Sequence, residues 1–406
     1  MKVGYIFSRY LHLSETFILR EMWELEQQGH EVAIYPLLRH GGKRHPRVAQ
    51  LRAPVRWTPW APLASHAYWL RRRPRTYLRT LAEVLWRNRS DGNLWRGAVA
   101  FWGKAVGIAE AMQKAGIEQV HAHYATHPAL VAYIVHRLTG LPYSFTVHAH
   151  DIFCHRAMLP EKMRAAEFVI AISGYNRNLL EQAVAPPRPP IHVVHCGIEW
   201  SAYAALGAAR PAAEPGGLRL LSVGTLEVSK GHRYLVEACA QLRQQEIPFQ
   251  CRIAGGGKEY TRLRRQIQAL GLAPQVELSG AATEEDVMQA LSWANVFVLP
   301  SVRLRNGKME GIPVALMEAM ASALPVVASR LSGIPELVLH GRTGFLVGER
   351  DVAALAGALT RLQDARLRKR MGAAASRSVR AGFELSANVA RLAGLWAAAH
   401  TREVAA

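Results

Sequence analysis

Short apolar runs alternate with longer stretches of helical periodicity in both halves of the chain, a pattern typical of strands followed by helices. The first series of apolar runs gives six expected strands: 3–7, 31–35, 118–121, 143–148, 168–172 and 191–194. The second series gives six more, near 218–223, 249–254, 275–279, 295–299, 325–328 and 344–347. This alternation predicts an α/β protein with two doubly wound parallel sheets, each a Rossmann-like domain, that face a cleft.

A segment rich in Ala, Pro and Gly separates the two series and is interpreted as a linker, residues 196–217. It divides the chain into an N-terminal domain, 1–195, and a C-terminal domain, 218–384. A chain of 406 residues is long enough to give each domain a full-sized core.

Cysteine usage and hydropathy indicate a reducing compartment and no membrane-spanning segment. The four cysteines are widely spaced and form no Cys-x-x-Cys pair, so neither a disulfide framework nor a zinc site is expected. The first residues enter a strand-like run that is too short for the core of a signal peptide. No run of about 18 uncharged apolar residues is present. We therefore expect a cytoplasmic protein.

Positive charge changes this picture, because the formal net charge of +19 is concentrated in one segment, 39–104. This segment has 15 Lys or Arg against Glu83 and Asp91, a net of +13, and it holds six of the ten Trp. Its helical pieces, around 64–88 and 93–115, interrupt the strand–helix alternation. The composition predicts an anionic partner, either a nucleic acid or a membrane surface.

The mixture of Arg with Trp favours the membrane surface. Arginines at 71–73, 75 and 79 lie among Trp60, Trp69 and Trp86, as expected where charge meets phosphate head groups and rings lie at the boundary. No recognised RNA- or DNA-binding module is present, so no nucleic-acid partner is expected. The alternative is a solvated basic face with the Trp residues buried in a helical core.

The stretch 308–320 places two carboxylates around an expected helix start. Pro313 suits the first turn of a helix, and good helix formers follow from Val314. Glu310 then lies in the preceding loop and Glu318 on the helix. Free N–H groups at a helix start bind phosphate. Since carboxylates suit hydroxyl groups, the combination predicts a site for a sugar phosphate. The alternative is a capped surface helix with two solvated glutamates.

This Glu-x7-Glu motif resembles the donor site of family 4 retaining glycosyltransferases. It continues with further family motifs in the same order: Ala-Met-Ala at 319–321, Leu-Pro-Val-Val-Ala at 324–328 and Gly-Ile-Pro-Glu at 333–336. The resemblance is densest over 220–348 and looser over most of the N-terminal half. It implies the GT-B fold, in which the N-terminal domain, 1–195, lies on the acceptor side and the C-terminal domain, 218–384, binds the nucleotide sugar. In that fold the last helix, here 386–400, crosses back onto the N-terminal domain.

The resemblance also implies a reaction and roles for these residues. A hexose is transferred from a nucleotide diphosphate sugar with retention of configuration, and the leaving phosphate takes the acceptor's proton in a front-face attack. Glu318 binds the ribose hydroxyls and Glu310 the sugar. The helix start after Gly311, with Ile312 and Val314, holds the diphosphate.

A turn after the strand 218–223 supplies the expected cation of the donor site. Lys230 stands there beside free backbone N–H groups and can form charge-assisted hydrogen bonds with a diphosphate. A solvated lysine at a helix start is the alternative. In family 4 the matching turn usually carries an arginine as well, but this sequence has Thr225 at that position. Arg303 or Arg305 is a candidate replacement.

No cofactor and no metal requirement are expected. Gly255, in the Gly-rich turn after the strand 249–254, lies near the nucleotide if the resemblance holds. The chain has no Gly-x-Gly-x-x-Gly fingerprint, which argues against a dinucleotide. It has no Asp-x-Asp, and the pair His150-Asp151 offers too few ligands for a dedicated metal site.

His148 ends the expected strand 143–148, and carboxyl ends of strands are where parallel sheets build their sites. It matches the N-domain active-site histidine of the family, which approaches the transferred sugar and the leaving phosphate. A chance polar strand end is the alternative. Further polar residues near the same rim are candidates for acceptor contacts: Ser14, Thr16, His123, His150 and Asp151.

The segment Ser-Glu-Thr-Phe-Ile at 14–18 resembles a subgroup associated with exopolysaccharide assembly, including colanic-acid-type enzymes. Many family members carry paired glycines there instead. A capped helix start is the alternative interpretation.

These observations favour a retaining, metal-independent hexosyltransferase that uses a nucleotide sugar donor and a glycan acceptor. A polyprenyl diphosphate-linked acceptor and a peripheral position on the inner face of the membrane would agree with the basic segment. A glycan phosphorylase is disfavoured because it would carry a pyridoxal phosphate lysine on a far longer chain. The remaining alternative is a non-enzymatic basic protein that binds a membrane surface or nucleic acid.

Overall fold

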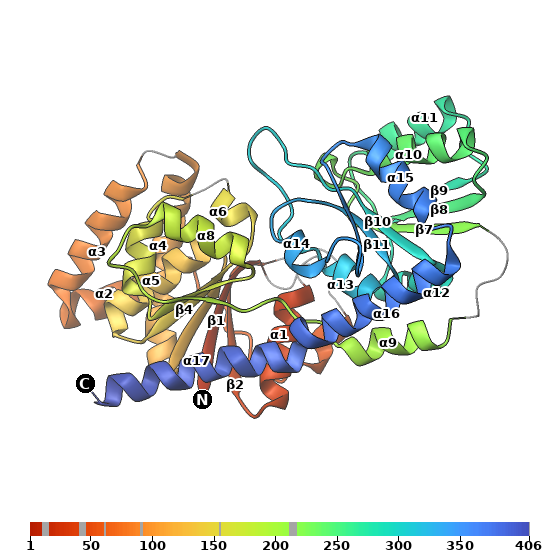
Figure 1. The fold of residues 1–406 in the computed structure, drawn as a ribbon. Coiled ribbons are helices and arrows are strands. Elements are labelled where there is room, and N and C mark those ends of the chain that lie inside the picture. Colours follow the sequence, from red (N-terminus) through yellow and green to blue (C-terminus); the bar gives the residue numbers. More distant parts are fainter. Residues whose placement is uncertain are drawn as a thin grey trace. The chain divides into compact units, whose positions relative to one another are not determined.

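The computed structural model describes residues 1–9, 16–39, 46–60, 62–89, 92–153, 156–210 and 217–405. The chain forms two compact units (Figure 1). The N-terminal unit contains Met1–Gly197 together with Leu385–Ala406, and the C-terminal unit contains Ile198–Glu384. The end of the chain therefore belongs to the same unit as its beginning.

The N-terminal unit is built on a parallel six-stranded sheet with the order β2-β1-β3-β4-β5-β6. Its strands are β1 Lys2–Arg9, β2 Glu31–Leu38, β3 Gln119–His123, β4 Tyr143–Val147, β5 Phe168–Ala171 and β6 Ile191–Val193. The order reverses at β1, because β2 lies on one side of it and β3 on the other. Such a switch point is where open α/β sheets bind ligands, outside the carboxyl ends of the strands.

Helices cover both faces of this sheet. They are α1 Thr16–Gln27, η1 Pro46–Gln50, α2 Leu63–Arg72, α3 Pro74–Arg87, α4 Gly92–Lys114, α5 His127–Thr139, α6 His150–Phe153, α7 Leu159–Ala165, α8 Gly174–Ala183 and α17 Leu385–Ala405. Local signals set several ends: α5 stops at Gly140, whose φ of +85° favours glycine. The side chain of Ser173 caps α8 by accepting from the N–H of Asn176. Among the described residues, no helix is both long and apolar enough to cross a membrane.

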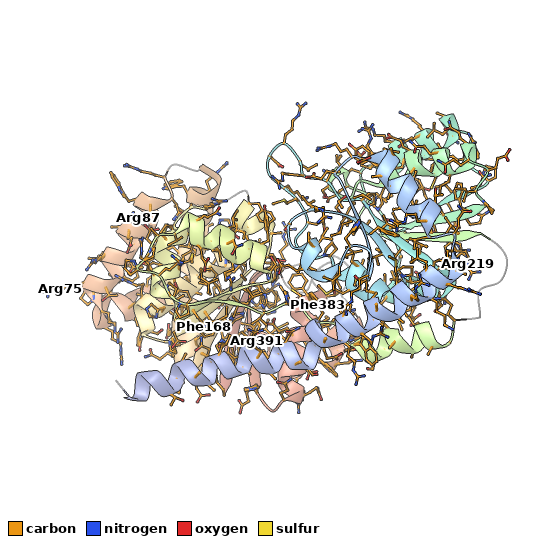
Figure 2. The ribbon with its side chains drawn as sticks, viewed as in Figure 1. Arg75, Arg87, Phe168, Arg219, Phe383 and Arg391 are labelled. Atoms are coloured by element: carbon orange, nitrogen blue, oxygen red, sulfur yellow. The ribbon has the colours of Figure 1, made fainter. Side chains whose placement is uncertain are left out.

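Successive residues of each strand face opposite sides of the sheet and build two apolar clusters. Ile6 and Tyr35 pack with α4 and α5 on one face. Tyr5, Phe168 and Trp396 pack on the other face, where α1 and α17 lie side by side (Figures 1 and 2). The helix expected at 386–400 is thus observed as α17, packed on the N-terminal sheet.

Within the basic segment 39–104, helices α2 and α3 form a layer on the outside of the N-terminal unit. Helices α2 and α3 pack on α4 (Figure 1). The helix expected around 64–88 is broken where Pro74 begins α3, since proline suits a first helical turn and cannot continue a helix. Trp69 and Trp102 are buried and donate hydrogen bonds, to the carbonyl of Val106 and the hydroxyl of Tyr77. Of the two interpretations of the Trp residues, burial in a helical core is therefore the correct one for Trp69 and Trp102.

The C-terminal unit has a second six-stranded sheet, with the order β12-β11-β10-β7-β8-β9 and parallel pairing. Its strands are β7 Leu218–Val223, β8 Phe249–Ala254, β9 Val276–Gly280, β10 Val296–Leu299, β11 Val326–Ser329 and β12 Gly344–Val347. Its helices are α9 Trp200–Ala208, η2 Val228–Lys230, α10 His232–Gln244, α11 Tyr260–Ala269, α12 Glu284–Trp293, α13 Val314–Ala321, α14 Ile334–Leu337, α15 Val352–Arg361 and α16 Ala365–Gly382. The order reverses between the neighbours β7 and β10, which gives this unit its own switch point.

The segment expected as a linker, 196–217, contains helix α9, which packs on α12 and α13. Tyr203 of α9 is buried. Arg210, just after this helix, donates to the carbonyls of Leu291 and Ser322. The Ala-rich composition that suggested a linker is also favourable for a helix, and a buried aromatic side chain fixes that helix in place.

Candidate active site

The turn after β7 and the loop after β10 meet at the switch point of the C-terminal sheet. Gly231 lies so close to the end of β10 that a Cβ atom there would be 1.8 Å from the carbonyl oxygen of Pro300. Its φ of +70° also favours glycine. The N–H of Val302 donates to the carbonyl of Ser229 at 2.8 Å. The loop 301–313 is therefore held directly against the turn that carries Lys230.

Two ion pairs also join this turn to this loop. Lys230 Nζ lies 2.8 Å from Glu310 Oε2, and both side chains are less than one-fifth exposed. Lys308 Nζ lies 2.7 Å from Glu227 Oε2 in a more open setting. The structure thus brings together the two residues assigned to the diphosphate and the sugar. It adds a second lysine, which sequence reasoning missed although Lys308 lies two residues before Glu310.

Helix α13 begins at Val314, with Pro313 as its N-cap, one residue later than expected. Glu318 lies one turn into this helix, and its Oε1 accepts a hydrogen bond from the hydroxyl of Tyr203 at 2.9 Å. This contact orients the carboxylate, and sequence reasoning missed it because Tyr203 lies in the segment expected as a linker. Ile312 is buried just before the helix, whereas Gly311 is half-buried.

The remaining donor-side candidates have different surroundings. Thr225 is exposed on the turn. Gly255 packs against that turn so closely that a Cβ atom there would lie 1.9 Å from the carbonyl oxygen of Gly224. A glycine is therefore required at position 255, because two loops pack closely together there. Arg303 and Arg305 are both exposed.

The histidine that follows the turn, His232, adds no positive charge to the turn. His232 is buried at the start of α10, and burial, followed by the charge of Lys230, lowers the pKa of its ring to about 3. His232 is therefore neutral at physiological pH.

The N-terminal candidate, His148, follows β4 and is held at both ends of its backbone. Its N–H donates to Asp151 at 3.1 Å, and its carbonyl accepts from the side-chain amide of Asn176. The rings of Phe17 and Tyr124 lie 4.7 and 4.8 Å from the His148 ring, centroid to centroid. The ring is only 6% exposed. Its position is therefore fixed by the protein before any ligand binds.

A buried chain of hydrogen bonds leads away from His148. His123 Nδ1 lies 3.1 Å from His148 Nε2, and His123 Nε2 lies 3.0 Å from Glu21 Oε1. The hydroxyl of Tyr5 donates to the same carboxylate oxygen at 2.7 Å. Glu21 comes from α1 and was not identified from the sequence, because nothing in the local pattern distinguishes it from other helix glutamates.

The pKa values of this cluster favour a carboxylate and a neutral His148. Burial, and then the charge of His123, hold the pKa of His148 well below its ordinary value. Burial raises the pKa of Glu21, but the charge of His123 and hydrogen bonds from His123 and Tyr5 together outweigh it, so this pKa is lowered. Glu21 is therefore ionised and His148 uncharged near neutral pH.

The acceptor-side candidates are placed differently from one another. His123 is completely buried and both its ring nitrogens are engaged within the protein, which argues against the acceptor contact expected for it. Asp151 is also buried and accepts from the N–H groups of His148 and Ala125, so it braces a turn. Thr16 is half-buried at the start of α1. Ser14 and the side chain of His150 lie outside the described residues.

The same cluster contains the one group of metal-type donors found among the described residues: Glu21, His121 and His123, whose donor atoms lie within 4.8 Å of one another. Each donor already has a hydrogen-bond partner. His121 engages the hydroxyls of Ser144 and Thr146 through its two nitrogens, at 2.9 and 3.0 Å. This saturated network fits a hydrogen-bonding role better than a metal site. Metal independence remains a prediction.

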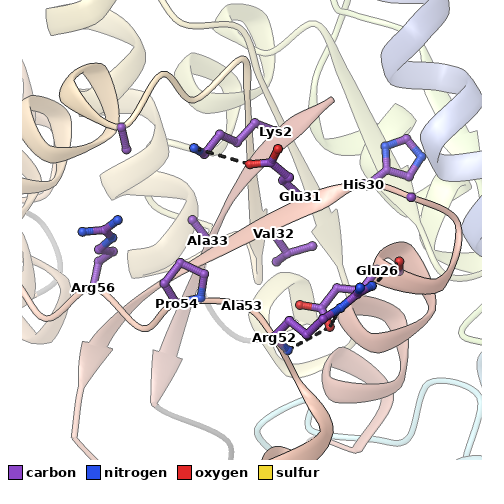
Figure 3. A pocket seen from close by; sticks show the side chains of 12 residues that line it. Lys2, Glu26, His30, Glu31, Val32, Ala33, Arg52, Ala53, Pro54 and Arg56 are labelled. Atoms are coloured by element: carbon purple, nitrogen blue, oxygen red, sulfur yellow. Dashed lines mark hydrogen bonds and ion pairs between the residues drawn. The ribbon is translucent and has the colours of Figure 1, made fainter.

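A surface pocket of about 390 Å³ lies at the amino ends of strands β1 and β2, away from the carboxyl ends of the strands where His148 lies (Figure 3). It is lined by Lys2 and Glu31 at the amino ends of β1 and β2, and by Arg52 and Arg56. Lys2 pairs with Glu31, and Arg52 with Glu26. Because parallel sheets bind ligands at their carboxyl ends, this pocket is not a candidate for the active site.

Comparison with known proteins agrees with this geometry. Residues 14–201 match the family described as Glycosyltransferase Family 4, and residues 209–378 match Glycosyl transferases group 1. The chain is 31% identical over 374 residues to the putative colanic acid biosynthesis glycosyltransferase WcaL of Escherichia coli K12, covering 88% of this chain and 89% of that one. It is 39% identical over 213 residues to the amylovoran biosynthesis glycosyltransferase AmsK of Erwinia amylovora, about half of each chain.

Among solved structures, HepE of Anabaena in complex with UDP superposes with a TM-score of 0.72 at 17% identity, covering 98% of this chain and 100% of that one. Together the fold and the matches define a glycosyltransferase of the GT-B type. The chain belongs to glycosyltransferase family 4. The two parallel sheets and the family resemblance expected from the sequence are confirmed, including the resemblance to exopolysaccharide enzymes.

Proposed function

We propose that this protein is a retaining glycosyltransferase that moves a hexose from a nucleotide diphosphate sugar to a glycan acceptor in exopolysaccharide synthesis. The observation that carries the proposal is the group Lys230, Glu310 and Glu318 around the start of α13, at the switch point of the C-terminal sheet. The names of the relatives, which refer to colanic acid and amylovoran, support the choice of product class.

The positions of these residues support the following mode of donor binding. A diphosphate placed at the start of α13 meets backbone N–H groups and the ammonium of Lys230. Lys230 then exchanges its contact with Glu310 for a phosphate oxygen, and Glu310 takes sugar hydroxyls instead. Glu318, oriented by Tyr203, accepts from the ribose hydroxyls. Binding of the two halves of the donor is thus coupled through one ion pair.

The proposed chemistry needs no protein nucleophile. The bond between the anomeric carbon and the diphosphate oxygen breaks, the acceptor oxygen bonds to the same face of that carbon, and its proton passes to the departing phosphate. Charge builds up on the phosphate in the transition state, so Lys230 and the helix start act where they lower the barrier most. His148 orients the transferred sugar and the leaving phosphate. No cofactor and no metal take part in this proposal.

Lys308 is proposed to replace the arginine that this sequence lacks at Thr225. Its ammonium lies over the turn through the pair with Glu227, and it belongs to the loop that carries Glu310. Lys308→Ala is expected to weaken binding of a nucleoside diphosphate about fivefold, equivalent to roughly 1 kcal/mol for a charge-assisted bond in an open setting.

The matched control for Lys308 is Arg305→Ala, which removes an exposed cation from the same loop. Calorimetry with UDP and GDP measures both variants. A larger loss of affinity in Arg305→Ala than in Lys308→Ala contradicts the assignment.

A panel of UDP- and GDP-hexoses, followed by mass spectrometry for hydrolysis or transfer, tests the proposed function. We expect turnover of one nucleotide class, with full activity in excess chelator. Product NMR should show the anomeric configuration of the donor. Absence of hydrolysis and transfer with every donor contradicts the function. An inverted anomeric coupling contradicts the mechanism, and loss of activity in chelator contradicts metal independence.

The structure also supports a membrane surface as partner. Large apolar side chains are exposed along the basic segment 39–104: Trp57, Trp60, Leu63, Leu70, Leu78, Trp86, Trp95 and Val99. Arg71, Arg72 and Arg75 are exposed among them, and Arg75 projects outward from α3 (Figure 2). We propose that this face binds anionic lipid on the inner side of the membrane, where a polyprenyl diphosphate-linked acceptor would be available. No nucleic-acid partner is proposed.

A further inference from the structure

Helix α9 packs on the two helices α13 and α16 of its own unit and is fixed near both of its ends (Figure 1). At its start, Trp200 Nε1 donates to the carbonyl oxygen and to the hydroxyl of Ser376 on α16, at 3.1 and 3.0 Å. Near its end, Gly207 lies so close to α13 that a Cβ atom there would be 2.7 Å from the carbonyl oxygen of Ser322. Tyr203 lies between these two contacts, so its position beside α13 is set by helix packing.

The hydroxyl of Tyr203 reaches from this fixed helix to the carboxylate of Glu318. It donates to Glu318 Oε1 at 2.9 Å. The side chain of Tyr203 is only 3% exposed, whereas Glu318 is half-buried. A carboxylate has about four acceptor sites on its two oxygens, so accepting from Tyr203 is compatible with accepting from hydroxyl groups of a ligand as well. The buried phenol therefore holds the carboxylate in one orientation without using up its acceptor capacity.

A fixed orientation of this carboxylate has a consequence for selectivity. A glutamate side chain that is free to rotate can turn to water when a ligand offers it no hydroxyl, and the cost of the missing hydroxyl is then small. A carboxylate that is held in place loses its hydrogen bonds when the hydroxyl is missing, so the site rejects such a ligand more strongly. Tyr203 should thus affect discrimination between ligands more than affinity in general.

We propose that Tyr203 is a positioning residue that sets the selectivity of the nucleotide site for ribose over sugars that lack the 2′ and 3′ hydroxyls. The proposal rests on the proposed function, which places Glu318 at the ribose. It assigns a role in donor recognition to the segment 196–217, whose composition had suggested a linker. Tyr203 and Glu318 both belong to the C-terminal unit, so nucleotide binding alone reports this role.

Calorimetry with UDP and GDP and with their 2′,3′-dideoxy forms tests the proposal. The wild-type protein is expected to prefer the ribonucleotide. Tyr203→Phe keeps the buried ring and removes only the hydroxyl, so we expect it to weaken binding of the ribonucleotide about three- to tenfold, the effect of one hydrogen bond. The dideoxy form should lose less than about twofold, because it makes no hydrogen bond to the carboxylate. Equal weakening of both forms, or no weakening of either, overturns the proposal.

Trp200→Phe is the matched control for a merely structural role of Tyr203. It removes hydrogen bonds from the same helix to α16 and leaves the hydroxyl of Tyr203 in place. We expect the preference for ribose to be the same in this variant as in the wild-type protein. If Trp200→Phe reduces this preference as much as Tyr203→Phe does, helix packing and not the hydroxyl is responsible, and the proposal is wrong.

Glu318→Ala separates this proposal from the proposed function. We expect it to abolish the preference for ribose, and adding Tyr203→Phe to it should cause no further change, because both substitutions act through one carboxylate. If Glu318→Ala retains the preference, the assignment of Glu318 to the ribose fails and the role of Tyr203 fails with it. If Glu318→Ala loses the preference but Tyr203→Phe retains it, the ribose site stands and only the role of Tyr203 is refuted.

Discussion

Lys230→Ala is expected to weaken binding of a nucleoside diphosphate by about 10- to 100-fold, the loss of one charge-assisted hydrogen bond of roughly 1.5–3 kcal/mol. The effect is larger than for Lys308 because the pair of Lys230 with Glu310 is more enclosed. Removing Lys230 also leaves the carboxylate of Glu310 uncompensated beside the incoming phosphates. Calorimetry measures this affinity, with Lys369→Ala on the exposed face of α16 as control.

Variants of the two glutamates should differ in their effects, one lowering nucleotide affinity and the other lowering kcat. Glu318→Ala removes the contact with the ribose and should also weaken nucleotide binding. Glu310→Gln should leave nucleotide affinity unchanged or slightly tighter, since the amide no longer holds Lys230, and should mainly lower kcat. Glu285→Ala, at an exposed position of α12, is the control. Unchanged affinity in both Lys230→Ala and Glu318→Ala refutes the assignment of the donor site.

The positions of Glu310 in a loop and Glu318 on a helix could be predicted from the sequence because the two residues are close together along the chain. The stretch from Glu310 to Glu318 contains a loop, a helix start and both carboxylates, so local rules for helix ends place them correctly. Lys230 was assigned from its own turn and the family resemblance, because alternation alone does not say that the strands 218–223 and 295–299, which are not consecutive, lie side by side. The pairing of β7 with β10 is observed.

Contacts between residues far apart along the chain could not be predicted. The pair of Tyr203 with Glu318 spans 115 positions, and that of His123 with Glu21 spans 102. No periodicity or motif encodes such a pair, because it depends on how whole helices pack on a sheet. The sequence pattern pointed to His148 but not to its contact with His123 or to Glu21, since a strand end is a local feature and a helix glutamate has no local mark.

The sequence also could not decide which Trp residues of the basic segment 39–104 are buried. Composition alone left the Trp residues either at a membrane boundary or in a helical core, and the structure divides them. Trp69 and Trp102 are buried, whereas Trp60 and Trp86 are more than 60% exposed. Sequence periodicity did not separate these groups because the four residues do not share one helix. Trp60 precedes α2, Trp69 and Trp86 lie on two short helices that meet at Pro74, and Trp102 lies on α4.

The exposed half of this segment leads to the prediction with the largest expected effect. Changing Arg71, Arg72, Arg73 and Arg75 to Glu is expected to abolish flotation with anionic liposomes. Each basic residue near an anionic leaflet contributes about 1 kcal/mol, so loss of four reduces partitioning by roughly a thousandfold, before the repulsion of the new carboxylates is counted. All four arginines are exposed, so their replacement removes no buried contact.

A second charge reversal separates local attraction from the effect of net charge. Changing Arg366, Lys369, Arg370 and Arg377 on α16 to Glu alters the total charge equally, at exposed positions far along the chain. We expect this variant to float with anionic vesicles nearly as well as the wild-type protein, and all three proteins to stay unbound with neutral vesicles. The single change Trp86→Ala should weaken flotation with anionic vesicles relative to the wild-type protein. Trp86 is 64% exposed, and the guanidinium of Arg89 lies 3.3 Å from the centroid of its ring. Equal flotation of the two charge-reversed proteins, or no flotation of the wild-type protein, rules out this face as the membrane contact.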